Sequence, residues 1–214
     1  ETNAQSALTG LYKAEIQMNS LAEFSPTDWW SYNGLLYLEF ASDNAYDRRG
    51  DNSVFNKLSD GTLTSNNGNL DNYWQYTYKK IARANYFLEN IDKTPISAEL
   101  LARFKAEARF IRACQYFYLS QYWGDAPLVT KTLTPNEANQ VSKAKKQELV
   151  TFVERELQEA ANDLPSYGKL TAAERGRASK QAALAFLGRI QLSEKAYADA
   201  IKSYEQIINA NVTS

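Results

Sequence analysis

The stretch Leu101–Pro127, LARFKAEARFIRACQYFYLSQYWGDAP, decides the fold of this chain. Its apolar residues recur every three or four positions on two adjacent faces, a pattern that predicts a helix packed on more than one side. We expect this helix to reach about Trp123. The next residues, Gly124–Pro127, predict its end, because glycine permits a left-handed cap and proline cannot continue a helix.

The segments on either side carry the same helical spacing. An apolar stripe runs from Trp74 to Ile91, after capping and turn residues at positions 66–69 (NNGN). Thr94-Pro95 predicts the N-cap and the first residue of the long helix. A further helix is predicted from Leu149 to Leu164, before a proline.

Near the end of the chain, small and large residues alternate at helical spacing over two short helices: Leu184, Leu187, Gly188, Tyr197, Ala200 and Tyr204. The small residues would let two antiparallel helices approach closely, while the large ones fill the space beside them. This spacing matches the tetratricopeptide unit, a helical hairpin of about 34 residues. The expected fold is therefore all-α, built from antiparallel hairpins of tetratricopeptide type.

The N-terminal part differs from the rest. Residues 4–18 predict an amphipathic helix with five residues facing inward: Ala7, Leu8, Leu11, Ala14 and Met18. Residues 21–69 are rich in Ser, Asn, Asp, Gly and aromatic residues and predict a long irregular insertion, which is uncommon unless it has a function. We expect a single domain over residues 1–214, with the helix and ligand-contacting insertion in 1–69 and the helical hairpins in 70–214.

Composition excludes several classes of function. The 24 basic and 25 acidic side chains give a net charge of −1, so nucleic-acid binding is not expected. There is no histidine, which removes histidine-based catalysis and histidine-ligated zinc from this chain. The single cysteine, Cys114, is expected to be a small core residue. We expect no metal and no cofactor.

Membrane insertion by this chain is not expected either, since no stretch approaches the roughly 18 consecutive apolar residues of a membrane-spanning helix. The chain opens on Glu1-Thr2-Asn3, without a charged and then apolar signal segment. Either the protein is soluble and intracellular, or a targeting segment has been removed. Composition alone leaves both possibilities open.

Three groups of segments together resemble the SusD/RagB family, the surface lipoproteins of Bacteroidetes outer membranes that capture nutrients. The first is 39–44 (EFASDN), and the third is 176–185 (GRASKQAALA), which leads into the predicted hairpin. The second group spans the two long helices: 73–74 (YW), 81–85 (IARAN), 107–113 (EARFIRA), 116–117 (YF) and 122–129 (YWGDAPLV). Their order and spacing extend over nearly the whole chain.

The resemblance implies capture of a nutrient without catalysis. SusD-like proteins bind oligosaccharides, or peptides in the RagB branch, and cover a SusC-like TonB-dependent transporter on the extracellular face of the outer membrane. Family members are longer, with a lipid-bearing cysteine near the mature N-terminus and a C-terminal half that supplies part of the ligand site. Cys114 lies within a predicted helix and cannot be that cysteine. We therefore interpret the chain as the N-terminal domain of a larger, lipid-anchored protein.

Two alternatives remain open at this point. The scaffold could capture peptides, or it could be a tetratricopeptide-type adaptor whose concave surface binds another polypeptide. A glycosidase would use paired carboxylates, and Glu39 and Asp43 lie four residues apart, so they would share a face of a helix. Such pairs are common on ordinary helices, so we expect no enzymatic activity.

The candidate ligand residues form two clusters in the predicted insertion. Trp29, Trp30 and Tyr32 are the first, since concentrated aromatic rings in a loop suit stacking on sugars. The alternative is that at least one of these rings anchors the loop.

The second cluster combines one aromatic ring with charged side chains: Asp43, Tyr46, Arg48 and Arg49. Its alternative is a hydrogen-bonded turn with salt-bridged arginines. Trp74 belongs to the helical stripe and is expected in the core.

Overall fold

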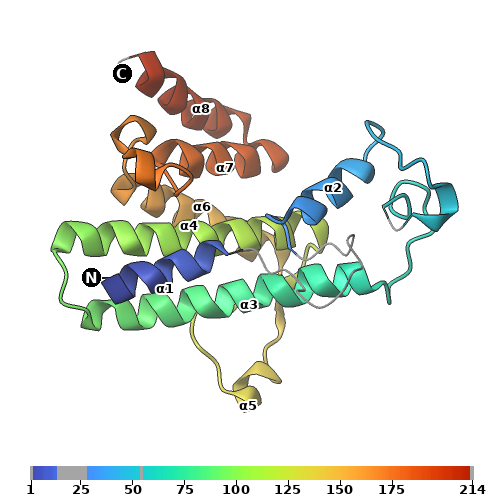
Figure 1. Ribbon diagram of the computed structural model, residues 1–214, viewed down its shortest axis with the longest axis horizontal. Coiled ribbons are helices and arrows are strands. Elements are labelled where there is room, and N and C mark those ends of the chain that lie inside the picture. The colour runs from blue at the N-terminus through green and yellow to red at the C-terminus, as the bar shows by residue number, and fades with distance from the viewer. Residues whose placement is uncertain (1, 14–27, 54, 213–214) are drawn as a thin grey trace. The chain divides into compact units, whose positions relative to one another are not determined.

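The computed structural model describes residues 2–13, 28–53 and 55–212 (Figure 1). These residues are mostly helical, which confirms the expected all-α class. The chain divides into two compact units. Unit 1 contains residues 1–12 and 80–214, and unit 2 contains residues 13–79. The division between Lys79 and Lys80 falls inside helix α3 (Gly68–Asn90).

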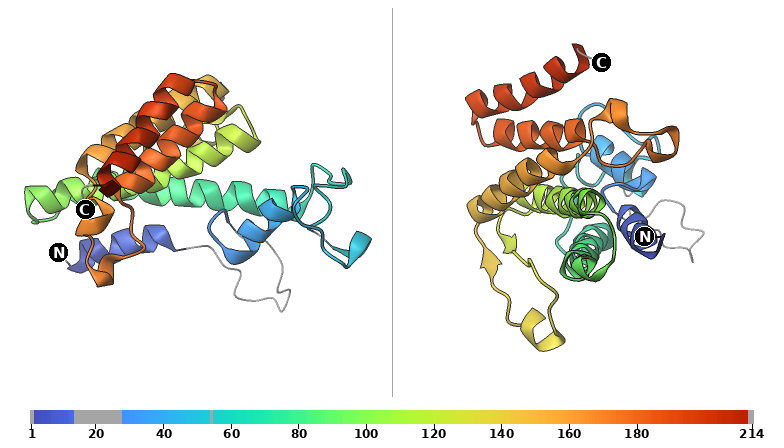
Figure 2. Two further views of the ribbon diagram at one scale, coloured as in Figure 1. Left: turned by 90° about the horizontal axis from the view of Figure 1, so that it is seen from above. Right: turned by 90° about the vertical axis from the view of Figure 1, so that its left-hand side faces the viewer.

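Unit 1 is a stack of helices. Helix α4 (Ala98–Tyr122) packs against α6 (Lys146–Asp163), α6 against α7 (Lys180–Ser193), and α7 against α8 (Tyr197–Val212). Helix α1 (Thr2–Tyr12) lies against α4. The right-hand view of Figure 2 shows α4, α6, α7 and α8 in successive layers.

Helix α4 is the central helix of unit 1, as its two apolar faces predicted. Every residue from 110 to 120 is buried, including the free Cys114, whose thiol pKa is raised by burial. After the helix, Gly124 has φ +72° and its N–H donates to the Leu119 carbonyl at 3.1 Å, which confirms the left-handed cap.

The start of α4 differs from the sequence prediction. Its N-cap is Ser97, whose hydroxyl accepts from the Leu100 N–H at 3.2 Å. Thr94 instead ends the 3₁₀ turn η2 (Ile91–Lys93). The Ile96 N–H donates back to the Thr94 carbonyl at 2.9 Å, so the chain makes a tight turn around Pro95 before the helix begins.

A buried polar network joins α4 to its neighbours. The Arg112 guanidinium donates to the Glu156 carboxylate on α6 at 2.9 Å and to the Asn85 side-chain oxygen on α3 at 2.7 Å. The Asn85 amide donates to the carbonyls of Val129 and Lys131 at 3.0 and 3.2 Å. Arg112, Glu156 and Asn85 therefore all have hydrogen-bond partners, which is the condition for burying a charge pair without a large penalty.

This network also fixes the base of a long excursion between α4 and α6. The excursion contains β1 (Ala126–Pro127), the short helix α5 (Pro135–Ala138) and β2 (Lys143–Ala144), and β1 pairs with β2 antiparallel. Figure 1 shows it extending away from the helices of unit 1. Most of its residues are exposed. The bonds from Asn85, together with those between Tyr116 and Val129 at 2.7 and 2.9 Å, attach its base to the helices.

The first helix confirms only part of its prediction. Ala4, Leu8 and Leu11 are buried in α1, whereas Ala7 is exposed, so the expectation of an inward Ala7 is wrong. The inward face follows the spacing 4, 8 and 11, which leaves position 7 on the edge of the stripe. Ala14 and Met18 lie outside the described residues.

Tyr12 ties the end of α1 to unit 1. Its hydroxyl donates to the buried Glu107 carboxylate at 2.6 Å and accepts from the Ala178 N–H at 2.9 Å. Burial and the Glu107 charge raise the pKa of the Tyr12 phenol. Glu107 is also bound by Arg103 and Arg177, so one carboxylate joins three segments that are distant in sequence.

The close approach of α7 and α8 is confirmed. Leu184, Leu187 and Ala200 are buried, and a Cβ built on Gly188 would lie 2.7 Å from the ring of Tyr204. Only a residue without a side chain fits at this position. The expectation that Tyr197 also faces inward is wrong, because this first residue of α8 is 58% exposed beside the turn.

We predict that Gly188→Ala destabilises the chain by about 1 to 2 kcal/mol, because the added methyl overlaps the Tyr204 ring. Alanine in an open helix position would be stabilising by about 1 kcal/mol, so the sign distinguishes close packing from helix propensity. The measurement is urea-induced unfolding followed by circular dichroism.

Two further variants control this prediction. Gly168→Ala adds a methyl where no atom lies within 4 Å and should leave stability nearly unchanged. Tyr204→Leu should reduce the cost of Gly188→Ala, because it removes the clashing ring atoms. Equal costs in both backgrounds would contradict the proposed contact.

Candidate functional site

Unit 2 begins, among the described residues, with a tight turn that leads into helix α2 (Tyr32–Phe40). This helix corrects the prediction of an irregular insertion over residues 21–69. Ser31 is its N-cap: the hydroxyl accepts from the Gly34 N–H at 2.9 Å and donates to the Asp28 carbonyl at 2.9 Å. A Cβ on Gly34 would lie 1.8 Å from that carbonyl oxygen, so glycine is required for the turn.

The turn directs Trp29 into the interior of unit 2. The indole is 2% exposed, stacks on Tyr73 with ring centroids 4.2 Å apart, and donates through Nε1 to the Thr77 hydroxyl at 2.8 Å. The Tyr73 hydroxyl donates to the Gly34 carbonyl at 2.7 Å. The expectation that Trp29 presents its ring to a ligand is therefore wrong, and the alternative of an anchor describes it.

The other members of the first cluster are placed differently. Trp30 is half-buried, and its backbone N–H donates to the Asp28 carboxylate at 2.7 Å. The backbone of Tyr32 begins α2, and its side chain lies outside the described part of the structure. Trp74, expected in the core, is half-buried and lies beside Tyr78, with ring centroids 5.0 Å apart. Trp29 and Trp30, the two members whose side chains are described, therefore differ in exposure.

A second group of aromatic residues attaches the segment after α2 to that helix. The Phe55 ring lies 5.3 Å from that of Phe40 and 5.9 Å from that of Tyr37, centroid to centroid. Tyr37 is fully buried, and burial raises the pKa of its phenol. Phe55 is 2% exposed, so it fixes one end of a loop that starts at Asp47.

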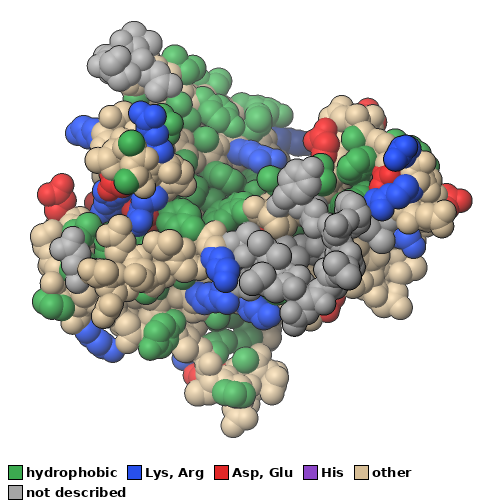
Figure 3. Space-filling view, viewed as in Figure 1, with side chains coloured by type: hydrophobic (Ala, Val, Ile, Leu, Met, Phe, Trp, Pro, Cys, Tyr) green, Lys and Arg blue, Asp and Glu red, His purple; other side chains and the backbone are tan. Residues whose placement is uncertain are grey.

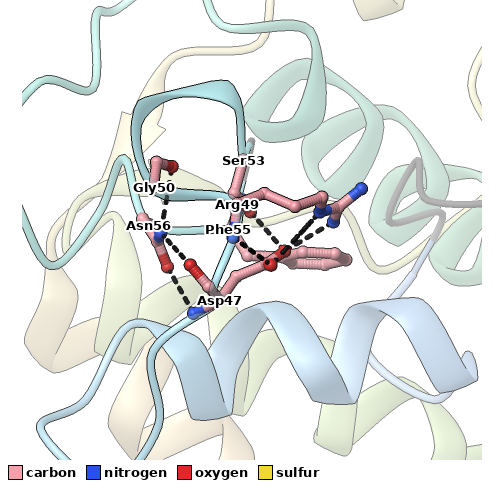
Figure 4. A network of polar contacts seen from close by, with 6 residues as sticks. All are labelled: Asp47, Arg49, Gly50, Ser53, Phe55 and Asn56. Atoms are coloured by element: carbon pink, nitrogen blue, oxygen red, sulfur yellow. Dashed lines mark hydrogen bonds and ion pairs between the residues drawn. The ribbon is translucent and has the colours of Figure 1, made fainter.

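Asn56 closes this loop, as Figure 4 shows. Its side-chain amide donates to the carbonyls of Asp47 and Gly50 at 2.9 and 3.1 Å, and its side-chain oxygen accepts from the Asp47 N–H at 2.9 Å. Asn56 is 1% exposed. One buried side chain therefore satisfies three backbone groups and holds residues 47–56 as a closed loop.

The Asp47 carboxylate forms the other half of the network in Figure 4. It accepts from the Ser53 hydroxyl at 2.6 Å, from the Arg49 backbone N–H at 3.1 Å and from the Arg49 guanidinium at 2.5 Å. These bonds, led by the one from the Arg49 guanidinium, hold the pKa of Asp47 well below its usual range. The carboxylate therefore stays ionised when most carboxyl groups become protonated, and the loop keeps this attachment as the pH falls through that range.

Tyr46 and Arg48 lie on the outside of the closed loop. Tyr46 is 65% exposed, and Arg48 is also exposed, whereas the Asp47 side chain between them is directed inward. Gly50 has φ +57°, and a Cβ built on it would lie 3.8 Å from the Tyr46 hydroxyl, so the phenol reaches back over the loop. Asp43 is exposed four residues before Asp47.

The second cluster thus separates into two kinds of residue. Arg49 belongs to the hydrogen-bonded turn, as the alternative interpretation held. Tyr46, Arg48 and Asp43 remain accessible. Sequence reasoning missed Ser53 and Asn56, and the only signal for them was a run of polar residues that could bond to nearby backbone groups.

The loop exposes one aromatic ring together with charged side chains. Glu39 is exposed near the end of α2, and Asp43 lies beyond that helix, so the two do not line one cleft. Within the described ranges, no three potential metal ligands are grouped, and no helix is both long and apolar enough to cross a bilayer.

The described residues are thus mainly helical, and residues of unit 2 form a hydrogen-bonded loop that exposes Tyr46 and Arg48. Residues 13–192 match a SusD-like family described as "Starch-binding associating with outer membrane". The chain therefore belongs to the SusD/RagB family, as the resemblance in its sequence implied.

Relatives support the same assignment. A SusD-like carbohydrate-binding protein of Bacteroides fragilis has a solved structure that is 44% identical, with a TM-score of 0.91 over 98% of this chain and 40% of its own. A laminarin-binding SusD-like protein is 26% identical, with a TM-score of 0.77 over 95% of this chain and 42% of its own.

The SusD-like protein P25 of Formosa agariphila is 28% identical over 98% of this chain and 39% of its own. The chain therefore spans about two fifths of the length of these relatives.

We predict that Trp29→Ala destabilises the chain by about 3 to 5 kcal/mol, the usual cost of removing a large buried ring. Trp29→Phe keeps a ring against Tyr73 but removes the donor to Thr77, and should cost about 1 to 2 kcal/mol. Thermal unfolding by circular dichroism measures both.

The double variant Trp29→Phe with Thr77→Val tests the hydrogen bond itself. Its cost should be smaller than the sum of the two single costs, because neither partner is left unpaired. A Trp29→Ala variant as stable as the unsubstituted chain would show that the indole is not an anchor.

Proposed function

We propose that this chain is part of a non-catalytic, cell-surface glycan-binding protein that delivers oligosaccharide to a SusC-like TonB-dependent transporter. The proposed location is the extracellular face of the outer membrane, reached through a lipid anchor. The family description names starch binding and the outer membrane, and one structural relative is named for laminarin binding. We extend these descriptions to this chain and propose that it captures a glycan and takes part in its delivery.

The observation that supports glycan capture is the exposed Tyr46 phenol on a closed loop. An aromatic ring can stack on the CH-rich face of a pyranose, while its hydroxyl bonds to a sugar hydroxyl. The Asp47 and Asn56 networks hold the backbone beside this ring before any ligand arrives. Little conformational entropy is then lost on binding, which favours affinity for a weakly interacting ligand such as a sugar.

Peptide capture and the adaptor function predict a different surface. An adaptor would need an apolar groove between helices, and the described groove between α4 and α6 is lined in large part by charged side chains. These are Lys105, Arg109, Glu159 and Asp163, beside Ala98, Leu101, Ala102 and Asn162. Arg109 and Glu159 form an ion pair across it. The charged lining of this groove does not suit an adaptor, whereas the exposed Tyr46 phenol suits glycan capture.

We predict that Tyr46→Ala weakens retention of a bound oligosaccharide at least about tenfold, the loss expected when one stacked ring contributes about 1.4 kcal/mol or more. Affinity electrophoresis in gels containing soluble glycans measures retention. The melting temperature should stay within the error of the unsubstituted chain, because an exposed side chain contributes little to stability.

Tyr86→Ala is the matched control, since Tyr86 is 63% exposed on α3 and lies outside the loop. It should leave retention unchanged. Equal retention by the Tyr46→Ala variant and the unsubstituted chain, on a glycan that both bind, would move the site away from this loop.

A further inference from the structure

We infer that the loop around Tyr46 binds an acidic saccharide, with Arg48 bonded to a uronate carboxylate of the ligand. This inference rests on the proposed function, because it names the class of glycan that the same site would take. It follows from three features of the loop: two exposed side chains lie on the same turn, one arginine of the turn is paired with Asp47, and the other is accessible.

Exposure alternates along residues 46–48. Tyr46 and Arg48 are exposed, and the side chain of Asp47 is only 11% exposed. Arg48 is the second residue of a turn in which the Gly50 N–H donates to the Asp47 carbonyl at 3.0 Å. The Tyr46 hydroxyl lies near Gly50 of the same turn. Both exposed side chains therefore belong to one turn, and an oligosaccharide that covers this turn can contact both.

The two neighbouring arginines have different roles. The charge of Arg49 is matched by Asp47 at 2.5 Å, within the network that closes the loop. The side chain of Arg48 makes no hydrogen bond or ion pair within the part of the chain that the structure describes. Arg48 therefore presents an unmatched guanidinium to the solvent on the same turn that Tyr46 precedes.

Exposed acidic groups occur in the same segment, and Figure 3 shows both signs of charge over the residues that follow α2. Asp43 and Asp51 are exposed, and neither is paired with Arg48. The surface is therefore not broadly basic, and it would not collect polyanions by net charge. Recognition of an anion here depends on the one guanidinium.

A uronate fits these two side chains together. The guanidinium presents parallel N–H donors in a plane that matches the two oxygens of a carboxylate. A uronic acid carries that carboxylate at the edge of a pyranose ring, and the face of the same ring can lie on Tyr46. Both contacts are made at the surface, so the ionic one is screened by salt while stacking is not.

The test compares two polymers with the same backbone: polygalacturonate and its fully methyl-esterified form. Affinity electrophoresis of the full chain, without divalent cations, measures retention by each polymer. The unsubstituted chain should bind the acidic polymer about tenfold more tightly, which corresponds to about 1.4 kcal/mol for the ion pair. The preference should shrink when NaCl is raised from about 50 to about 500 mM.

Substitutions separate the two contacts. Arg48→Gln should abolish the preference for the acidic polymer and leave retention of the esterified polymer unchanged. Arg48→Lys should keep part of the preference, because the charge remains and the planar pair of donors is lost. Tyr46→Ala should weaken retention of both polymers. Arg175→Gln removes an exposed arginine outside the loop and should change neither.

The outcomes distinguish the two levels of the proposal. Equal retention of both polymers, unchanged by Arg48→Gln, would overturn the acidic ligand and leave glycan capture in place. The same preference in the Arg48→Gln variant would overturn the role of Arg48. Binding of neutral glycans such as laminarin, with no retention of either galacturonan, would also reject the uronate. Failure to retain any glycan would reject the proposed function itself.

Discussion

Unit 2 depends on the burial of one indole. Trp29 stacks on Tyr73 and donates to Thr77, and both partners lie on α3. The turn before α2 brings the Asp28 carbonyl against the backbone of Gly34, where a Cβ would overlap its oxygen. Glycine at this position therefore allows the turn that buries Trp29. The start of α2 is thereby fixed to α3, and the segment that follows α2 begins from a defined position.

A second, polar constraint acts on the loop that follows α2. Phe55 packs on Tyr37 and Phe40 of α2. Hydrogen bonds between Asp47 and Asn56 close the loop that begins at Asp47. A loop closed by buried hydrogen bonds can hold an exposed ring still, so the ring does not have to be ordered by the ligand. Unit 1 supplies the stable helical stack of the same chain, with its own buried Arg112–Glu156 pair.

The sequence predicted the regular parts of the fold because they depend on local spacing. The two apolar faces and the GDAP ending of α4, and the small residues Gly188 and Ala200, are visible along the chain. Helix α2 was missed because its sequence, YNGLLYLEF, has almost no polar face and lies among turn-forming residues. The burial of Trp29 could not be seen, since its partner Thr77 is 48 residues away and has no spacing relation to it.

The most direct test of this account is hydrogen–deuterium exchange of the backbone amides with and without a bound glycan. The account predicts slower exchange in peptides that cover residues 44–53 when glycan is added, and little change in peptides that cover residues 73–77, which are already ordered around Trp29. Protection confined to the groove between α4 and α6, with no change at residues 44–53, would contradict it.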